Sequence, residues 1–174
     1  MITSYVKSGN TLAMLQGLPL DIDQNLVWVQ VYLPTAEELE LLNDIFSIDL
    51  INSNTGEVEI DDYHYIRSEL LTLSTECQPT FGKILFILGE KVLITINSTE
   101  NFRPFENALR RLNRKATYHE TSRSTLRVLL QIANDNTDNV IDCIAEGLKE
   151  TSDEIFQISE GRGEDGKELG VQDL

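Results

Sequence analysis

The sequence predicts an α/β fold, and two kinds of segment predict it. Segment 26–33 is dense in Val, Trp and Tyr, and segment 83–96 alternates apolar and other residues as a β-hairpin does. Segments 35–46 and 122–158 repeat apolar residues at the spacing of amphipathic helices. The chain has 174 residues, 41% of them hydrophobic, which is enough for one core, so a single domain is the simplest organisation.

The N-terminal region predicts a hairpin followed by a strand. Met1–Val6 and Thr11–Leu15 flank Lys7–Asn10, whose Gly and Asn suit a tight turn. Leu26–Leu33 is a stronger strand, and it ends at Pro34, which cannot donate a ladder hydrogen bond.

A helix is predicted directly after this strand. Thr35 and Glu38 have the spacing of a capping box, in which each side chain accepts a hydrogen bond from the other residue's backbone amide. The apolar face of this helix consists of Leu39, Leu42, Ile45 and Phe46. We expect this face to pack on the sheet.

Four more strands are predicted in the middle of the chain. They are 57–62, 65–75, 83–88 and 91–96. A loop at Asn52–Gly56 precedes the first of them, and Gly89-Glu90 is the turn between the last two.

A basic helix is predicted over Phe102–Lys115, with Pro104 near its first turn, where a missing amide proton costs nothing. Its basic residues are Arg103, Arg110, Arg111, Arg114 and Lys115. Two interpretations fit them. They face acidic surface within the protein or on a neighbour, or they form a solvated helix face.

The last predicted element is a long amphipathic helix over 122–158. Its apolar seam contains Leu126, Leu129, Ala133, Val140, Ile144, Leu148, Ile155 and Ile158. At about 1.5 Å per residue the helix is roughly 50 Å long, more than a small domain needs to cover its sheet. We therefore divide the chain into an α/β core at 1–120, a long acidic helix at 121–158 that extends from it, and a flexible tail at 159–174.

The long helix carries a row of carboxylates at successive i, i+4 positions. These are Asp138, Asp142, Glu146, Glu150 and Glu154, with Asp135 just before them. Like charges at this spacing oppose each other by about 0.2–0.5 kcal/mol per pair. Either solvent relieves this repulsion on an ordinary acidic face, or a cation or a basic partner does. Because Mg²⁺ keeps several of its waters, we expect any metal binding to be diffuse and to use Asp135, Asp138, Asp142 and Glu146.

The overall charge narrows the possible partners. A net charge of -15 argues against nucleic acid and against anionic membrane surfaces, both of which are bound by Lys and Arg. It favours divalent cations, basic proteins or simple solubility.

Cys77 and Cys143 have no metal-ligand spacing, so we expect reduced thiols. Without a secretory signal or a long apolar run, this part of the protein is expected to be soluble and cytoplasmic.

No catalytic motif is present, so we do not expect an enzyme, a covalently bound cofactor or a catalytic residue. His64 beside Asp61 and Asp62 is either a metal ligand or an ordinary exposed strand histidine. His119 is expected in the loop before the long helix. Gly161–Gly166 has the form of a dinucleotide fingerprint, but it follows a helix in a polar tail, so we interpret it as part of a flexible linker.

Several motifs together resemble the N-terminal cytoplasmic domain of the CorA family of divalent metal ion transporters. Val27–Glu38 is similar to the family's Trp-led strand with its Pro-Thr, and Phe46-Ser47-Ile48 is similar to its Phe-Gly-Ile. Ile84–Gly89 is similar to the family's Phe-Ile-Leu-Gly hairpin, and Arg103-Pro104-Phe105 to the opening of its next helix. Asp153–Phe156 ends a helix like the family's first long acidic one, so the resemblance covers residues 26–158 in order.

The resemblance implies a three-layer α/β/α sandwich with a mixed sheet that assembles as a homopentamer. It implies a regulatory domain that couples the divalent cation level, for example Mg²⁺, to channel gating. The family's two membrane spans and Gly-Met-Asn signature are absent from the sequence, so we expect a truncated chain in which 159–174 starts the next helix. The longer protein would lie at the cytoplasmic face of the cell membrane.

Two departures from the family concern its cation sensor. The Glu-Asp pair expected after Ile48 is missing, and Gln131 occupies the position of a sensing aspartate. We therefore expect no sensor site of the usual form and a diffuse cation-responsive surface in its place. The alternative function is a free-standing acidic protein-interaction module whose long helix docks on another protein.

Overall fold

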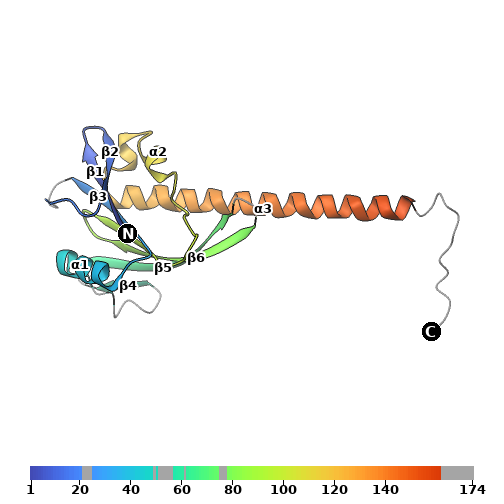
Figure 1. Cartoon of the computed structure of the whole chain (residues 1–174). Helices are drawn as coiled ribbons and strands as arrows, with labels where there is room; N and C mark the ends of the chain where they lie inside the picture. Colours follow the sequence, from blue (N-terminus) through green and yellow to red (C-terminus); the bar gives the residue numbers. More distant parts are fainter. Residues whose placement is uncertain (21–24, 49, 51–56, 61, 75–77, 162–174) are drawn as a thin grey trace.

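The computed structural model describes residues 1–20, 25–48, 50, 57–60, 62–74 and 78–161, with the backbone alone at 57–60 and 157–161. One mixed sheet has α1 on one face and α2 and α3 on the other (Figure 1). The expected three-layer α/β/α sandwich with a mixed sheet is therefore confirmed. The predicted loop at 52–56, Cys77 and nearly all of the glycine-rich tail lie outside the described residues.

The elements follow the chain in this order. The strands are β1 Ile2–Ser8, β2 Thr11–Gln16, β3 Leu26–Tyr32, β4 Glu57–Ile60, β5 Tyr63–Leu73, β6 Pro79–Leu88 and β7 Leu93–Asn97. The helices are α1 Ala36–Phe46, α2 Ala108–Leu112, the short 3-10 helix η1 Ala116–Tyr118, and α3 Ser122–Gly161. The long helix thus begins where the sequence places it and ends three residues later.

The sheet has the order β2-β1-β3-β7-β6-β5-β4. Every neighbouring pair is antiparallel except β3 and β7, which run parallel in the middle. All five residues of β7 are buried, as expected for a central strand that is covered on both faces. The predicted hairpin at Gly89 is present, but β6 starts at Pro79, four residues earlier than the sequence pattern indicates, because it pairs with β5 from His64 to Leu73.

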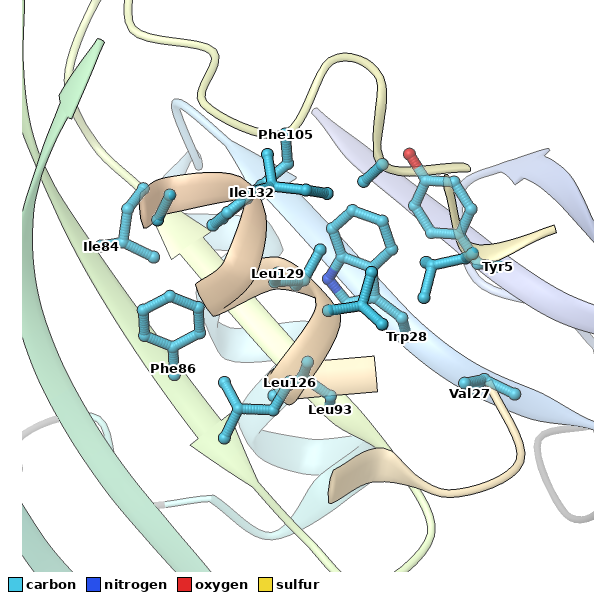
Figure 2. Close-up of a cluster of buried hydrophobic side chains, with 14 of the residues drawn as sticks. Tyr5, Val27, Trp28, Ile84, Phe86, Leu93, Phe105, Leu126, Leu129 and Ile132 are labelled. Carbon is cyan, nitrogen blue, oxygen red and sulfur yellow. The ribbon is translucent and has the colours of Figure 1, made fainter. Parts of the chain in front are cut away.

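Strand residues alternate between two hydrophobic cores. On one face Val29 and Val31 of β3 pack with Leu42 and Phe46 of α1. On the other face Trp28 packs in the cluster that contains Leu126, Leu129 and Ile132 of α3 (Figure 2). Both helices are therefore attached through opposite faces of the same central strands.

The capping box of α1 is confirmed. The Glu38 amide donates to Thr35 Oγ1 at 3.2 Å, and the Thr35 amide donates to Glu38 Oε2 at 3.0 Å. The N-terminal ammonium of Met1 also donates to Glu38 Oε2, at 2.8 Å. This hydrogen bond is the main reason why the pKa of Glu38 is lowered.

The prediction of a helix over 102–115 is wrong. Only Ala108–Leu112 is α-helical, and η1 follows it. The Asn97 side chain donates to the carbonyl of Phe102, and the Asn136 side chain donates to the carbonyl of Pro104 at 3.1 Å. The contact from Asn97 is local, five residues away, whereas that from Asn136 comes from α3; together they hold the carbonyls of Phe102 and Pro104 in a non-helical arrangement, so side-chain hydrogen bonds override the local helical pattern.

The close packing of Gly82 against the Phe102 side chain can be tested by substitution. A Cβ atom at Gly82 would lie 2.1 Å from Cδ1 of Phe102, whose side chain is 1% exposed and cannot move aside. We expect Gly82→Ala to lower the free energy of unfolding by about 1–3 kcal/mol, as overpacked cores do. Urea unfolding measures this change.

The matched control is Gly147→Ala on α3, where a Cβ meets nothing within 4 Å. Alanine is the better helix former, so this variant should gain up to about 1 kcal/mol. Equal effects of the two substitutions would contradict the packing described for Gly82.

Candidate functional site

The acidic row of α3 is the candidate site, and its first member has a partner within the chain. Arg111 of α2 forms an ion pair and hydrogen bond with Asp135. The Arg111 side chain is 31% exposed and that of Asp135 55% exposed, so the pair contributes little stability by itself. It does show that one residue of the basic segment faces acidic surface within the protein. It also leaves Asp135 less available to a cation.

The other three predicted residues lie on the exposed part of α3. Asp138, Asp142 and Glu146 are all exposed, one helical turn apart along the helix. A spacing of four residues advances each carboxylate by about 6 Å, so they do not converge on one point. In the part of the chain that the structure describes, no group of three or more His, Cys, Asp or Glu residues could hold a metal ion. The row offers an extended negative surface, suited to hydrated cations.

The surroundings of Gln131 differ from those of the acidic row. Gln131 lines a shallow depression of ≈ 370 Å³ on α3 together with Arg123 and Arg127. Two guanidinium groups beside this residue disfavour a divalent cation by charge repulsion. Arg127 and Arg123 lie four and eight residues before Gln131, so the helical spacing in the sequence already carried this signal.

The alternative metal site around His64 is not assembled in the described residues. His64 lies half-buried on β5, and Asp61 falls outside the described residues. Asp62 instead lines a cleft of ≈ 1220 Å³ with Tyr63, Lys7, Lys91 and others. The pKa of Tyr63 is raised, mainly by burial and then by Tyr65 and Asp62. Because this cleft mixes lysines with carboxylates, it offers no uniform field for a cation or an anion.

His119 lies between η1 and α3, as the sequence predicts, but it is buried, which the sequence does not indicate. His119 is 2% exposed, and neither ring nitrogen has a hydrogen-bond partner among the residues that the structure describes. Burial, followed by the nearby Lys7 ammonium, lowers its pKa. Lys7 itself donates to the Glu120 carbonyl at 3.0 Å, which holds its charge close to the imidazole. His119 is therefore suited to the neutral form.

Comparison with known proteins places the chain in a family. Residues 23–168 match the family described as CorA-like Mg²⁺ transporter protein. The chain belongs to this family. The resemblance seen in its motifs is thereby confirmed, over a slightly longer stretch than the motifs covered. A search of curated protein sequences returned no match.

Solved structures with the same fold include CorA proteins. The complete structure of the CorA magnesium transporter from Methanocaldococcus jannaschii aligns with a TM-score of 0.69 at 14% identity, covering 90% of this chain and 52% of that one. The soluble domain of the same organism's CorA aligns at 0.67 and 16% identity, covering 90% and 65%. The full-length CmaX protein aligns at 0.63 and 13% identity, covering 100% and 54%. At these identities the likeness shows the fold.

This CorA-like chain spans about half to two thirds of the length of the three aligned proteins, 52%, 65% and 54%. Within its described residues no helix is both long enough and apolar enough to cross a membrane.

His119 makes the stability of this CorA-like chain depend on pH. Its pKa is lower in the folded chain than in the unfolded chain, so the unfolded chain binds more protons between the two values. The free energy of unfolding should therefore fall as the pH drops below about 6.5, the ordinary histidine value. Urea unfolding between about pH 5 and pH 8 measures this slope.

Replacing His119 by a residue that does not titrate tests whether His119 causes the pH dependence of stability. His119→Gln should reduce the pH dependence, because it removes the imidazole whose pKa is lowered in the folded chain. A slope that survives in His119→Gln would exclude this histidine as the cause.

Proposed function

We propose that this chain is the cytoplasmic regulatory domain of a CorA-like divalent cation transporter, and that it couples the cation level to gating. The observation that carries the proposal is the family match over residues 23–168. The shared fold with the soluble domain of a CorA protein supports it. No catalytic role is proposed.

In this proposal the cation is both the cargo and the signal. Membrane spans elsewhere in the longer protein would carry Mg²⁺ or another divalent ion, and the chain would lie at the cytoplasmic face. The functional unit would be a homo-oligomer, a pentamer as in the CorA family. A net charge of -15 on each subunit then makes repulsion between subunits a large force at low ionic strength.

The acidic row of α3 would make the stability of the closed assembly depend on the cation concentration. Asp138, Asp142 and Glu146 repel one another along the helix and repel neighbouring subunits. Hydrated Mg²⁺ spread over this surface would reduce both repulsions and hold the closed assembly. When the cation level falls, the repulsion returns and favours opening.

Thermal unfolding with and without Mg²⁺ tests the acidic row. Millimolar Mg²⁺ should raise the unfolding midpoint more than a monovalent salt of equal ionic strength, because a divalent ion is attracted more strongly to closely spaced carboxylates. The combined variant Asp138→Asn, Asp142→Asn, Glu146→Gln should lose this excess.

A control variant matches the change in charge. Glu40→Gln, Glu90→Gln and Glu106→Gln together remove three exposed carboxylates that lie outside α3, so this variant should keep the Mg²⁺ response. If the two triple variants behave alike, the row has no special role. If Mg²⁺ and the matched monovalent salt shift the unchanged chain equally, specific binding is excluded.

The ion pair between α2 and α3 gives a second test. Arg111→Gln should cost no more than about 1 kcal/mol without Mg²⁺, because both side chains are partly exposed. It should enlarge the Mg²⁺ response, since Asp135 loses its cationic partner. Arg110→Gln, an exposed neighbour, serves as the control. A smaller Mg²⁺ response in Arg111→Gln than in Arg110→Gln would contradict the proposal.

A further inference from the structure

Residues 114–121 link α2 to α3, and hydrogen bonds attach the residue at each end of this link to the sheet. Before the link, the Leu12 amide donates to Asn113 Oδ1 at 2.7 Å, and Asn113 Nδ2 donates to the Leu12 carbonyl at 3.1 Å. After it, the buried Ser122 hydroxyl donates to the Gly89 carbonyl at 2.7 Å. The link therefore lies between two attachment points that do not depend on its own conformation.

The link itself lies mostly at the surface. Within 114–121, all of which the structure describes, His119 alone is buried. Tyr118 is half-buried against the cluster that contains Trp28, and Lys7 of β1 donates to the Glu120 carbonyl at 3.0 Å. The burial of one imidazole is therefore central to how the link is held against the sheet.

Burying the imidazole of His119 is costly even when it is neutral. Neither ring nitrogen has a hydrogen-bond partner in the described part of the chain, so the ring gives up its hydrogen bonds to water without replacement. Protonation increases this cost, because an imidazolium has a full charge and two N–H donors. Water solvates both forms when the link is open. Opening is therefore easier once the ring is protonated.

The charges on and beside the link also oppose a proton on His119. The Lys7 ammonium adds to the effect of burial in lowering its pKa. The link carries two cations, Arg114 and Lys115, and one carboxylate, Glu120. A protonated ring would therefore add a further positive charge to a region in which positive charge already predominates.

The cleft beside the link does not supply a carboxylate for the ring. Three carboxylates line this cleft together with two lysines: Asp62, Glu90, Glu120, Lys7 and Lys91. All three carboxylates are exposed, and none of them forms a hydrogen bond with the buried ring. They therefore do not compensate a charge on His119 while the link is closed.

We propose that the link 114–121 is a pH-sensitive switch, in which protonation of His119 brings the ring out of its buried site and separates the link from β1. The link opens between Asn113 and Ser122, and the sheet and α3 keep their packing because those two residues stay bonded. When the pH rises, His119 loses its proton and the link closes again. The proposal does not depend on the transporter role, because it rests on the contacts of the link.

Amide hydrogen exchange of the 174-residue chain in low concentrations of urea tests the proposal. The probes are the amides of Tyr118 and His119, which donate within the link to Lys115 and Ala116 at 3.0 and 3.2 Å. A turn this short does not persist without its packing, so opening exposes both amides. From about pH 7.5 to about pH 5.5 their protection factors should fall by up to about tenfold, the limit for a group of ordinary pKa near 6.5.

The urea dependence separates opening of the link from unfolding of the whole chain. Urea should barely change the protection of Tyr118 and His119, because a local opening exposes little surface. The reference amides are those of Val128 and Leu129 on α3, both fully buried, whose exchange should accelerate with urea. If the probes followed urea as the reference does, the link would open only with the whole fold, and the proposal would be overturned. Protection of the probes that does not change with pH would also overturn it.

Two variants assign the response to one residue. His119→Leu keeps an apolar side chain in the buried site and removes the titrating group, so the protection of the Tyr118 amide should no longer depend on pH. His64→Gln replaces the other histidine of the chain and should leave the response unchanged. A response that survives in His119→Leu, or that disappears in His64→Gln, would contradict the proposal. The comparison of probe and reference amides in the unchanged chain decides the question even if a variant fails to fold.

Discussion

The packing of Trp28 against α3 is the contact on which the arrangement of this molecule depends. The indole is fully buried, stacks on Tyr5 with ring centroids 4.2 Å apart, and meets the edge of Phe105 at 6.2 Å. Its Nε1 donates to Thr95 Oγ1 at 3.0 Å, so its one polar group is satisfied. Leu129 of α3 lies in the same cluster (Figure 2). One side chain thus joins β1, β3, β7 and the base of the long helix.

Much of this fold could be predicted from local sequence, because its strongest signals are local. The capping box at Thr35, the turn at Gly89 and the apolar seam of α3 each depend on residues within a few positions of one another. The helix predicted over 102–107 does not form, and one of the two reasons is non-local. The turns there depend on Asn97 and Asn136, and Asn136 is 32 residues from the carbonyl it binds.

In the candidate site, too, some features follow from local sequence and others depend on contacts between distant parts of the chain. The positions of Asp138, Asp142 and Glu146 on one helix follow from their spacing, and the structure places them there, exposed. The partner of Asp135 did not follow, because Arg111 comes from a helix 24 residues earlier and its direction depends on how α2 packs. The burial of His119, with Lys7 of β1 nearby, likewise depends on residues far apart in the chain, and a lone histidine gives no local signal of it.

The attachment of α3 through its first half alone has a mechanical consequence. The helix is held up to Val140 and continues for 21 further residues to Gly161 without support from the sheet. It therefore acts as a lever whose short arm lies in the Trp28 cluster. A tilt of about 5° at Val140 displaces the far end by about 3 Å, given a rise of 1.5 Å per residue. Leu129 in the Trp28 cluster lies about 16 Å from Val140 on the other side, so the same tilt moves it by about 1.4 Å, and a movement in the core is about doubled at the far end.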